Sequence, residues 1–341
     1  MKLLTNIFSI INIDKKHKMI TLLGLKIKIK RKQKDKGQLS AANMRKLVAY
    51  VEQIKFILDS CCDITQCKPA TGTFRKVQMF RAKVLKYLLE LFQENGIQYW
   101  IDGGSLLGAQ RHKGFVPWDD DIDIATDRDN YDKMLELLPK LFENTGLSMD
   151  FGRGHTGFYM KIYYNDFDIT DVFVYDYSNN DCSREHLYEL WTNSRVDFYQ
   201  TYPPKQLWSG ELDIKNLYSK LKDYYRKGNL TLEEGIENKW LFKGFDAATK
   251  NLTCNIFAVD KVFPLQKVQF EDMEVYAPKD IHNYLTTVNS GNYGDYMQFP
   301  PLSSSHVFLS NEYDSDEFLE TLNKNIESFD KLLEQKLGQP V

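Results

Sequence analysis

The strongest constraint on this chain is a run of acids in the heptapeptide WDDDIDI, residues 118–124. Asp119, Asp121 and Asp123 occupy alternate positions, and isoleucines stand at two positions of the opposite parity. Because successive side chains of a strand point to opposite faces, this pattern predicts a strand with one buried face and one acidic face. Carboxylates in this number suit Mg²⁺ or Mn²⁺, whereas a bare D-x-D motif more often marks an acidic surface turn. Two of these carboxylates can therefore converge on one cation.

The motif Gly103-Gly104-Ser105 lies upstream of the acids, between a predicted strand at 98–101 and a predicted short helix at 106–110. We expect this motif to be a turn whose backbone N–H groups cradle phosphates, which places all three residues in the substrate site. A glycine-serine turn followed by alternating acids on a strand resembles the nucleotidyltransferase superfamily. In that arrangement a third acid is expected on an adjacent strand.

Apolar periodicity predicts the other elements of the chain. Predicted helices cover residues 44–58, 77–91 and 131–138, and predicted strands cover 122–125, 158–164, 167–174 and the stretches around 257–263 and 268–276. Either Thr126 or Asp127 can cap the third helix. We expect an α+β fold, in which a nucleotidyltransferase-like mixed sheet is flanked by helices and followed by a mostly helical second half.

The expected domain organisation follows from these elements. Residues 1–36 form a basic leader with a small hairpin between 19–23 and 25–32, and residues 40–95 form a helical lead-in. The predicted parts downstream are a catalytic region at 96–300, a helical insertion within it at about 180–250, and a C-terminal helical segment at 301–341.

One long segment resembles the LicD/fukutin family of phosphotransferases. It reads YWIDGGSLLGAQRHKGFVPWDDDIDIATDRDNYDKML at residues 99–135. Two later segments are also similar to the family, namely MKIYYNDFDITDVFVYD at 160–176 and FEDMEVYAPKDIHNYLTTVNSGNYGDYM at 270–297. The similarity therefore covers roughly residues 60 to 300.

This resemblance implies transfer of phosphocholine, or of an alditol phosphate such as ribitol phosphate, from a CDP-linked donor to a glycan hydroxyl. CMP is then the leaving group. The family's metal acids correspond to Asp121 and Asp123, with Asp119 as a helper, and its third acid corresponds to Asp171. We expect Asp171 to act as a general base or as a further metal ligand. The local sequence is Asp-Val-Phe-Val, where the family commonly has Asp-Ile-Phe-Pro.

The nearest rival of Asp171 is Asp168. In a regular strand, Asp171 shares a face with Phe167, Ile169 and Phe173, whereas Asp168 points to the other face. We therefore expect Asp171 to be catalytic and Asp168 to lie away from the site.

Four cationic residues complete the predicted substrate site. Arg111, His112 and Lys113 lie between the glycine motif and the acids, where they can neutralise a diphosphate or the departing CMP. They match the family's Arg-His-Lys-Gly. Lys161, in the segment at 160–176, is the fourth candidate, and the alternative for each is a solvated surface cation.

The charge of the chain is unevenly distributed. Residues 1–40 hold eleven Lys or Arg against two Asp, a balance of +9, although the formal net charge of the whole chain is -3. Such an arm can contact anionic lipid headgroups, or it can be a solvated leader. We expect a peripheral membrane contact through residues 1–36, and we expect no nucleic-acid partner.

Each apolar stretch of the leader is shorter than the ~20 residues that a spanning helix needs. Lysines also interrupt the apolar run that a secretory signal would require. We therefore expect a cytoplasmic protein, at the inner face of a bacterial membrane where the leader binds it. Five cysteines, an odd number, favour reduced thiols over a disulfide framework. A zinc site at Cys61, Cys62 and Cys67 would need a fourth ligand from elsewhere in the chain.

The predicted function is therefore metal-dependent transfer of phosphocholine from CDP-choline to a cell-surface glycan such as lipooligosaccharide, teichoic acid or capsule. A second enzyme hypothesis is transfer of ribitol phosphate, glycerol phosphate or another phospho-group. A hypothesis of another class is a non-catalytic protein that binds glycan or nucleotide. A nucleic-acid binder, suggested by the leader alone, ranks third and would show a steep dependence of affinity on salt.

Overall fold

The computed structural model divides into two compact units, residues 1–62 and 63–341, which are described separately. The residues that the structure describes are 8–14, 17–22, 25–30, 53–54, 56–151, 159–203, 214–231, 237–246, 255–287, 297, 313 and 315–337.

The first unit contains a three-stranded antiparallel sheet of β1 (Phe8–Asp14), β2 (His17–Leu22) and β3 (Leu25–Lys30), in that order. Strands β2 and β3 form the predicted hairpin, and β1 extends it by a strand that was not predicted. Residues 53–54 and 56–61 are helical, and the rest of the helix predicted at 44–58 lies outside the described residues.

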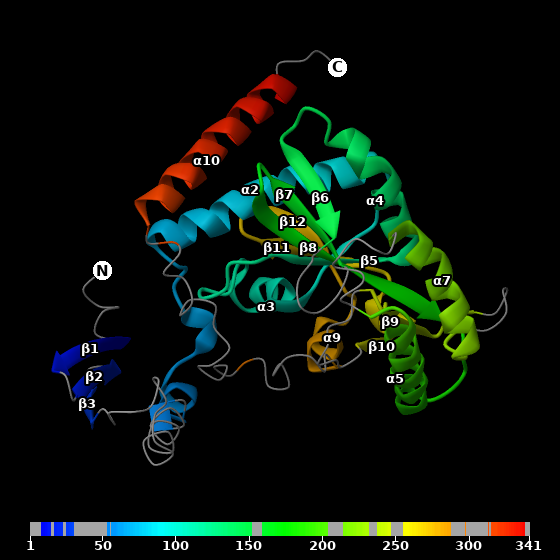
Figure 1. Ribbon diagram of the computed structural model, residues 1–341, viewed down its shortest axis with the longest axis horizontal. Helices are drawn as coiled ribbons and strands as arrows, with labels where there is room; N and C mark the ends of the chain where they lie inside the picture. The colour runs from blue at the N-terminus through cyan, green and yellow to red at the C-terminus, as the bar shows by residue number, and fades with distance from the viewer. Residues whose placement is uncertain are drawn as a thin grey trace. The chain divides into compact units, whose positions relative to one another are not determined.

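The second unit is built on a mixed sheet of seven strands (Figure 1). These strands are β4 (Trp100–Ile101), β5 (Asp123–Asp127), β6 (Leu147–Phe151), β7 (Met160–Tyr164), β8 (Phe167–Ser178), β9 (Trp240–Lys243) and β10 (Ile256–Ala258). The main path is β10-β9-β8-β5-β4, and β7 joins β8 to β6. Strands β5 and β8 are parallel, whereas the other pairs are antiparallel. The predicted α+β class is confirmed.

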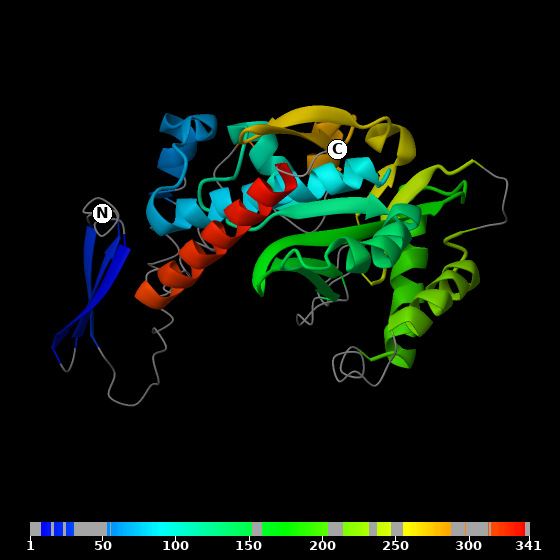
Figure 2. The ribbon, with the colours of Figure 1, turned by 90° about the horizontal axis from the view of Figure 1, so that it is seen from above.

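Long helices cover this sheet. Helix α2 (Gly72–Glu94) packs on β8, and α4 (Arg128–Leu141) packs on β5, β6 and β8. Helix α10 (Asp316–Leu337) lies alongside α2 in both views (Figure 2). Among the described residues, no helix combines the length and the apolar character that crossing a bilayer requires.

The remaining elements of the second unit are shorter. They are a 3-10 helix (Ile64–Gln66), α3 (Gly103–His112), α8 (Val259–Val262), α9 (Ile281–Thr287) and the hairpin of β11 (Gln266–Phe270) with β12 (Met273–Ala277). The strand predicted around 257–263 is divided between β10 and α8, because the chain turns helical directly after Ala258.

The predicted insertion contains α5 (Arg184–Thr201) and α7 (Ile214–Lys227), which lie side by side (Figure 1). It also contains β9, a strand of four residues that was not predicted and that pairs with β8. The insertion has a hydrophobic core of its own, in which Trp191 and Phe198 pack against Phe245. Burial of large aromatic rings, rather than helix propensity alone, holds this part together.

A buried ion network links the insertion to the sheet. The Arg128 guanidinium, at the start of α4, makes two hydrogen bonds of 2.7 and 2.8 Å to Asp176 and two of 2.8 and 2.9 Å to Asp246. The Tyr225 hydroxyl, from α7, donates to Asp176 at 2.8 Å. Burial opposes the charge of Arg128, but both carboxylates raise the pKa of its guanidinium well above the ordinary value.

Candidate active site

The glycine motif begins a helix and does not form a separate turn, which corrects the prediction from sequence. Asp102 caps α3, because its carboxylate accepts a hydrogen bond of 2.8 Å from the Gly103 N–H. Gly103 has φ +52°, and a Cβ at this position would collide with the carboxylate of Asp123. A Cβ at Gly104 would collide with the carboxylate of Asp119. The glycines therefore make room for the acids, since only residues without a Cβ permit this approach.

Ser105 fixes the start of the acidic strand. Its hydroxyl accepts a hydrogen bond of 2.9 Å from the backbone N–H of Asp123. The same hydroxyl lies 3.5 Å from the carbonyl oxygen of Asp121. Ser105 therefore fixes the backbone of both predicted metal ligands, Asp121 and Asp123.

The predicted third acid, Asp171, lies on β8, next to the strand β5 that carries Asp123. Asp171 and Asp123 are partners in the parallel pairing of β8 with β5, and the Asp171 N–H donates to the Ile122 carbonyl at 2.9 Å. Asp123 is half-buried, and the loss of water around its carboxyl raises the pKa of this group well above the ordinary value. Negative charges on four other carboxylates raise this pKa further, and they belong to Asp121, Asp171, Asp102 and Asp119. Several carboxylates therefore converge on one small region, as in many functional sites.

Strand β8 is not regular, so the predicted separation of Asp168 from Asp171 is wrong. The register against β7 shifts at Ile169, so that Lys161 is paired with Asp171, and Tyr163 with Asp168. A bulge of one residue changes the parity of a strand, which brings both acids to the same face. Accordingly, the Lys161 ammonium lies 2.8 Å from Asp171 and 2.6 Å from Asp168.

This ammonium balances the effect of burial on Asp171. Burial raises the pKa of the Asp171 carboxyl and Lys161 lowers it, with a result of about 6. Burial opposes the positive charge of Lys161, but Asp171 and Asp168 raise the pKa of its ammonium. Lys161 is thus held between two carboxylates in this structure.

A further acid, Asp102, was not predicted to belong to the site. Its carboxylate accepts hydrogen bonds from the hydroxyls of Tyr284 at 2.9 Å and Tyr175 at 3.2 Å. The Asp102 N–H in turn donates to the Asp123 carbonyl at 2.9 Å. Its place directly before the glycine motif was the only signal in the sequence. Asp102 joins α3, β8 and α9 behind the acids.

Asp120 has a structural role. Its carboxylate pairs with the Arg81 guanidinium at 2.7 Å and accepts a hydrogen bond from the Tyr313 hydroxyl. Arg81 also donates to the carbonyl oxygen of Asp168 at 2.8 Å. These contacts fasten the acidic segment and β8 to α2.

The side chains of the Arg-His-Lys run at 111–113 have different environments. The Arg111 guanidinium lies 5.9 Å from the Trp118 ring, and the His112 ring lies 6.3 Å from the same ring. Burial and the charge of Arg111 lower the pKa of His112 to about 4, so this imidazole is neutral at pH 7. Lys113 is exposed and ends α3 with φ +57°. A role for these residues in binding the donor stays a prediction.

Residues 96–209 match the model of the LicD/FKTN/FKRP nucleotidyltransferase domain. This region is a LicD-family domain. The chain is 27% identical over 269 residues to a Haemophilus influenzae protein named lipopolysaccharide cholinephosphotransferase LicD, a match that covers 67% of this chain and 93% of the relative.

Two further relatives share shorter segments with the chain. An uncharacterized protein of Rickettsia prowazekii is 38% identical over 73 residues, which is 21% of this chain and 27% of the relative. The human protein named ribitol 5-phosphate transferase FKRP is 46% identical over 40 residues, which is 12% of this chain and 8% of that protein.

The LicD-family domain contains the predicted acids, the glycine motif and Lys161. Among the described residues, no group of three or more His, Cys, Asp or Glu side chains is arranged as a ready metal site. A pair of carboxylates is nevertheless the usual protein contribution to a Mg²⁺ site that substrate phosphates complete. The mutual repulsion that raises the pKa of Asp123 is the kind that a divalent cation relieves. The acids therefore fit such an ion.

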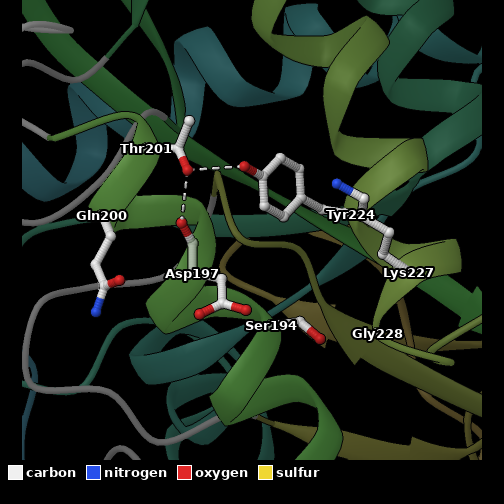
Figure 3. A pocket seen from close by; sticks show the side chains of 7 residues that line it. All are labelled: Ser194, Asp197, Gln200, Thr201, Tyr224, Lys227 and Gly228. Atoms are coloured by element: carbon white, nitrogen blue, oxygen red, sulfur yellow. Dashed lines mark hydrogen bonds between the residues drawn. The ribbon is translucent and has the colours of Figure 1, made fainter.

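A polar pocket of about 320 Å³ lies elsewhere, between α5 and α7 (Figure 3). It is lined by Ser194, Asp197, Gln200, Thr201, Tyr224, Lys227 and Gly228. The Tyr224 hydroxyl donates to the Thr201 hydroxyl at 2.9 Å, and the latter donates to the Asp197 carbonyl at 3.0 Å. None of the acids of the LicD-family site lines this pocket.

Proposed function

We propose that this LicD-family domain transfers phosphocholine from CDP-choline to a hydroxyl of a cell-surface glycan such as lipopolysaccharide and releases CMP. The observation that carries the proposal is the pairing of Asp123 with Asp171 on adjacent parallel strands, beside Asp121. This arrangement supplies acids from two strands at one place, as metal-assisted phosphoryl transfer requires. The Haemophilus influenzae relative, whose name states cholinephosphotransferase activity, supports the choice of phosphocholine.

The proposed reaction is one in-line displacement. The oxygen of the acceptor hydroxyl forms a bond to the phosphorus that carries choline, and the bond from this phosphorus to the CMP oxygen breaks. Asp171 accepts the proton of the hydroxyl. Its carboxylate is held in place by an ion pair of 2.8 Å with Lys161. The products are the phosphocholine-bearing glycan and CMP.

Asp121 and Asp123 would hold Mg²⁺ or Mn²⁺ through their carboxylates. When bound, such an ion neutralises the charge that develops on the phosphate oxygens. The glycines at 103 and 104 let α3 approach the carboxylates of Asp123 and Asp119, so the same motif that starts the helix shapes the acidic site.

A second candidate activity is transfer of ribitol phosphate from a CDP-linked donor. The match to FKRP, at 46% identity over 40 residues, favours it. Both activities use the same acids and differ in the group attached to the second phosphate. The choice of donor is therefore a property of the pocket around that group and not of the metal acids.

A donor panel tests both candidates. We would incubate the protein with CDP-choline, CDP-ribitol or CDP-glycerol and a glycan acceptor, and measure CMP release with Mg²⁺ and with a chelator. Preferential Mg²⁺-dependent release from CDP-choline is expected. Preference for CDP-ribitol or CDP-glycerol would change the donor, and binding without turnover of any donor would favour a non-catalytic protein.

We further propose that residues 1–36 place the enzyme at an anionic membrane. The support is the excess of positive charge in this segment, which lies outside the region that matches the family model. Flotation with anionic liposomes should be weaker for protein that lacks residues 1–36, and the attachment should fade as salt shortens the Debye length from ~10 Å at 0.1 M to ~3 Å at 1 M. Equal flotation of both forms would show a solvated leader.

A further inference from the structure

The pocket between α5 and α7 is lined by polar side chains from one stripe of each helix (Figure 3). Ser194, Asp197 and Thr201 are three and four residues apart on α5, so their side chains share one face of that helix. Tyr224 and Lys227 are likewise three residues apart on α7. The facing stripes of two packed helices are ordinarily apolar, so packing alone does not explain polar side chains at this seam.

Ser194 brings an unsatisfied hydroxyl to this pocket. The residue is 7% exposed, and its hydroxyl makes no hydrogen bond within the part of the chain that the structure describes. Gly228, directly after α7, leaves room for this hydroxyl, because a Cβ at position 228 would collide with it. A buried hydroxyl without a partner costs stability, so such a group is expected where a ligand can satisfy it.

Two more side chains present hydrogen-bonding groups to the pocket. The carboxylate of Asp197 and the amide of Gln200 make no hydrogen bond to another described residue. Together with the Ser194 hydroxyl, they offer a ligand both donors and acceptors. These three groups lie on α5, opposite Tyr224 and Lys227 of α7.

Tyr224 forms a fixed aromatic wall of the pocket. Its hydroxyl donates to the Thr201 hydroxyl at 2.9 Å, and its ring packs edge-on against Phe198 with 5.3 Å between ring centroids. The Lys227 ammonium lies 5.7 Å from the centroid of the same ring. The volume of about 320 Å³ is near the lower end of the ~300–1,000 Å³ that is typical of small-molecule sites.

The lining favours a neutral ligand that carries several hydroxyl groups. Asp197 and Lys227 have opposite charges, so the lining has no excess charge that would select an anion or a cation. A sugar hydroxyl both donates and accepts, and neighbouring hydroxyls can therefore satisfy Asp197, Gln200 and Ser194 together. The apolar C–H face of a sugar ring can pack on an aromatic ring such as that of Tyr224.

We propose that this pocket binds a saccharide unit of the acceptor glycan. The inference rests on the proposed function, which supplies the glycan, and adds to it a second binding site on the helical insertion. None of the acids of the LicD-family site lines the pocket, so the unit bound here is not the one that receives the phospho-group. A saccharide held at both places is anchored more tightly than one held at the acids alone.

The chain offers a matched control for Asp197. Asp223 lies on α7 outside the pocket, is 72% exposed and pairs with Arg226 at 3.9 Å. Asp223→Ala therefore removes a carboxylate from the same pair of helices without changing the lining. Ser194→Ala separates binding from folding, because loss of a hydroxyl without a partner should not lower the melting temperature.

The test measures binding of lactose, cellobiose and N-acetylglucosamine to the wild type and the three variants by saturation-transfer-difference NMR spectroscopy. We expect the wild type to bind at least one of these saccharides at millimolar concentration. Ser194→Ala should weaken this binding roughly threefold to tenfold, and Asp197→Ala about tenfold or more, as loss of a neutral and of a charged hydrogen bond does. Asp223→Ala should bind as the wild type does, and inorganic phosphate should not displace the saccharide. Thermal melting confirms that each variant is folded.

Binding of none of the three saccharides by the wild type would overturn the inference, as would wild-type affinity in Asp197→Ala and Ser194→Ala. Displacement of the saccharide by phosphate would show an anion site instead. If saccharide binds in the pocket but no CDP-linked donor is turned over, the proposed function fails and the saccharide site stands. If a donor is turned over but Asp197→Ala keeps the wild-type KM for the glycan acceptor, the inference fails and the proposed function stands.

Discussion

Two clusters of carboxylates share strand β8, and their negative charges are compensated in different ways. Near the end of the strand, Asp176 and Asp246 share the forked guanidinium of Arg128, and Tyr225 donates a further hydrogen bond. Near its start, Asp171 faces Lys161, but its parallel neighbour Asp123 has a pKa raised by burial and by four other carboxylates. In the first cluster, Arg128 and Tyr225 neutralise or hydrogen-bond the carboxylates. In the second cluster, several carboxylates lie close together and repel one another.

This difference separates structural charge from functional charge. A buried ion pair that is fully hydrogen-bonded fixes the elements that carry it, as the Arg128 network fixes α4, β8 and the segment after β9. A group of carboxylates that repel one another costs stability, and proteins keep such groups where a cation or a reaction needs them. The comparison predicts opposite effects of mutation on stability and activity in the two clusters.

The largest effect is expected at the metal acids. Asp121→Asn and Asp123→Asn should each reduce turnover on the order of 1,000-fold or more, which is about 4 kcal/mol of transition-state stabilisation. In metal-free buffer their thermal stability should equal or exceed that of the wild type, because a repulsive charge is removed. The measurements are CMP release at saturating donor and limiting metal, and thermal melting. Wild-type turnover in either variant would exclude these residues as ligands.

Removal of the central cation of the other cluster should unfold the protein more easily. Arg128→Met leaves Asp176 and Asp246 buried without their partner, and we expect the free energy of unfolding to fall by about 3–5 kcal/mol. Urea denaturation measures this loss. The control is Lys324→Met, which removes an exposed surface pair with Glu320 and should leave the free energy of unfolding almost unchanged. Equal losses of unfolding free energy in the two variants would show that the Arg128 network does not stabilise the fold.

Asp168 and Asp171 both contact Lys161, but we expect only Asp171 to be needed for transfer. Asp171→Ala should abolish transfer, because Asp171 is the strand partner of Asp123. Asp168→Ala should retain measurable transfer, since this side chain is 40% exposed, against 15% for Asp171. Initial rates of both variants at saturating CDP-choline decide the matter. An inactive Asp168→Ala beside an active Asp171→Ala would reverse the assignment.

The smallest effect concerns His112, whose burial should appear in the dependence of stability on pH. The folded protein holds this imidazole neutral with a pKa of about 4, whereas the ordinary value is 6.5. The unfolded chain therefore binds more protons between these values, so the contribution of His112 is fully present above pH 6.5 and is lost as pH falls towards 4. Urea denaturation at pH 7, 6 and 5 should show a shallower loss for His112→Gln than for the wild type. Parallel curves would contradict the burial of this ring.

Local patterns in the sequence were sufficient for a large part of the molecule. The apolar repeat from Val77 to Leu91 predicted α2, and the alternation of acids with Ile122 and Ile124 predicted β5. The strand begins only at Asp123, however, so Asp119 and Asp121 precede it and the predicted acidic strand face is only partly formed. Asp127 was one of two predicted caps, and it caps α4 by accepting a hydrogen bond from the Asn130 N–H. Each of these features depends on residues a few positions apart, so periodicity and capping are enough to predict them.

Tertiary structure decided the features that depend on pairing between distant segments. The bulge at Ile169 placed Asp168 and Asp171 on one face, against the expectation from alternation. The approach of Gly103 to Asp123 likewise joins two elements that are separated in the chain. Strand register is set by hydrogen bonds to a neighbouring strand and by the packing of whole elements, and a shift of one residue reverses every side chain. The sequence by itself therefore determined which acids could act, and the sheet determined which of them meet.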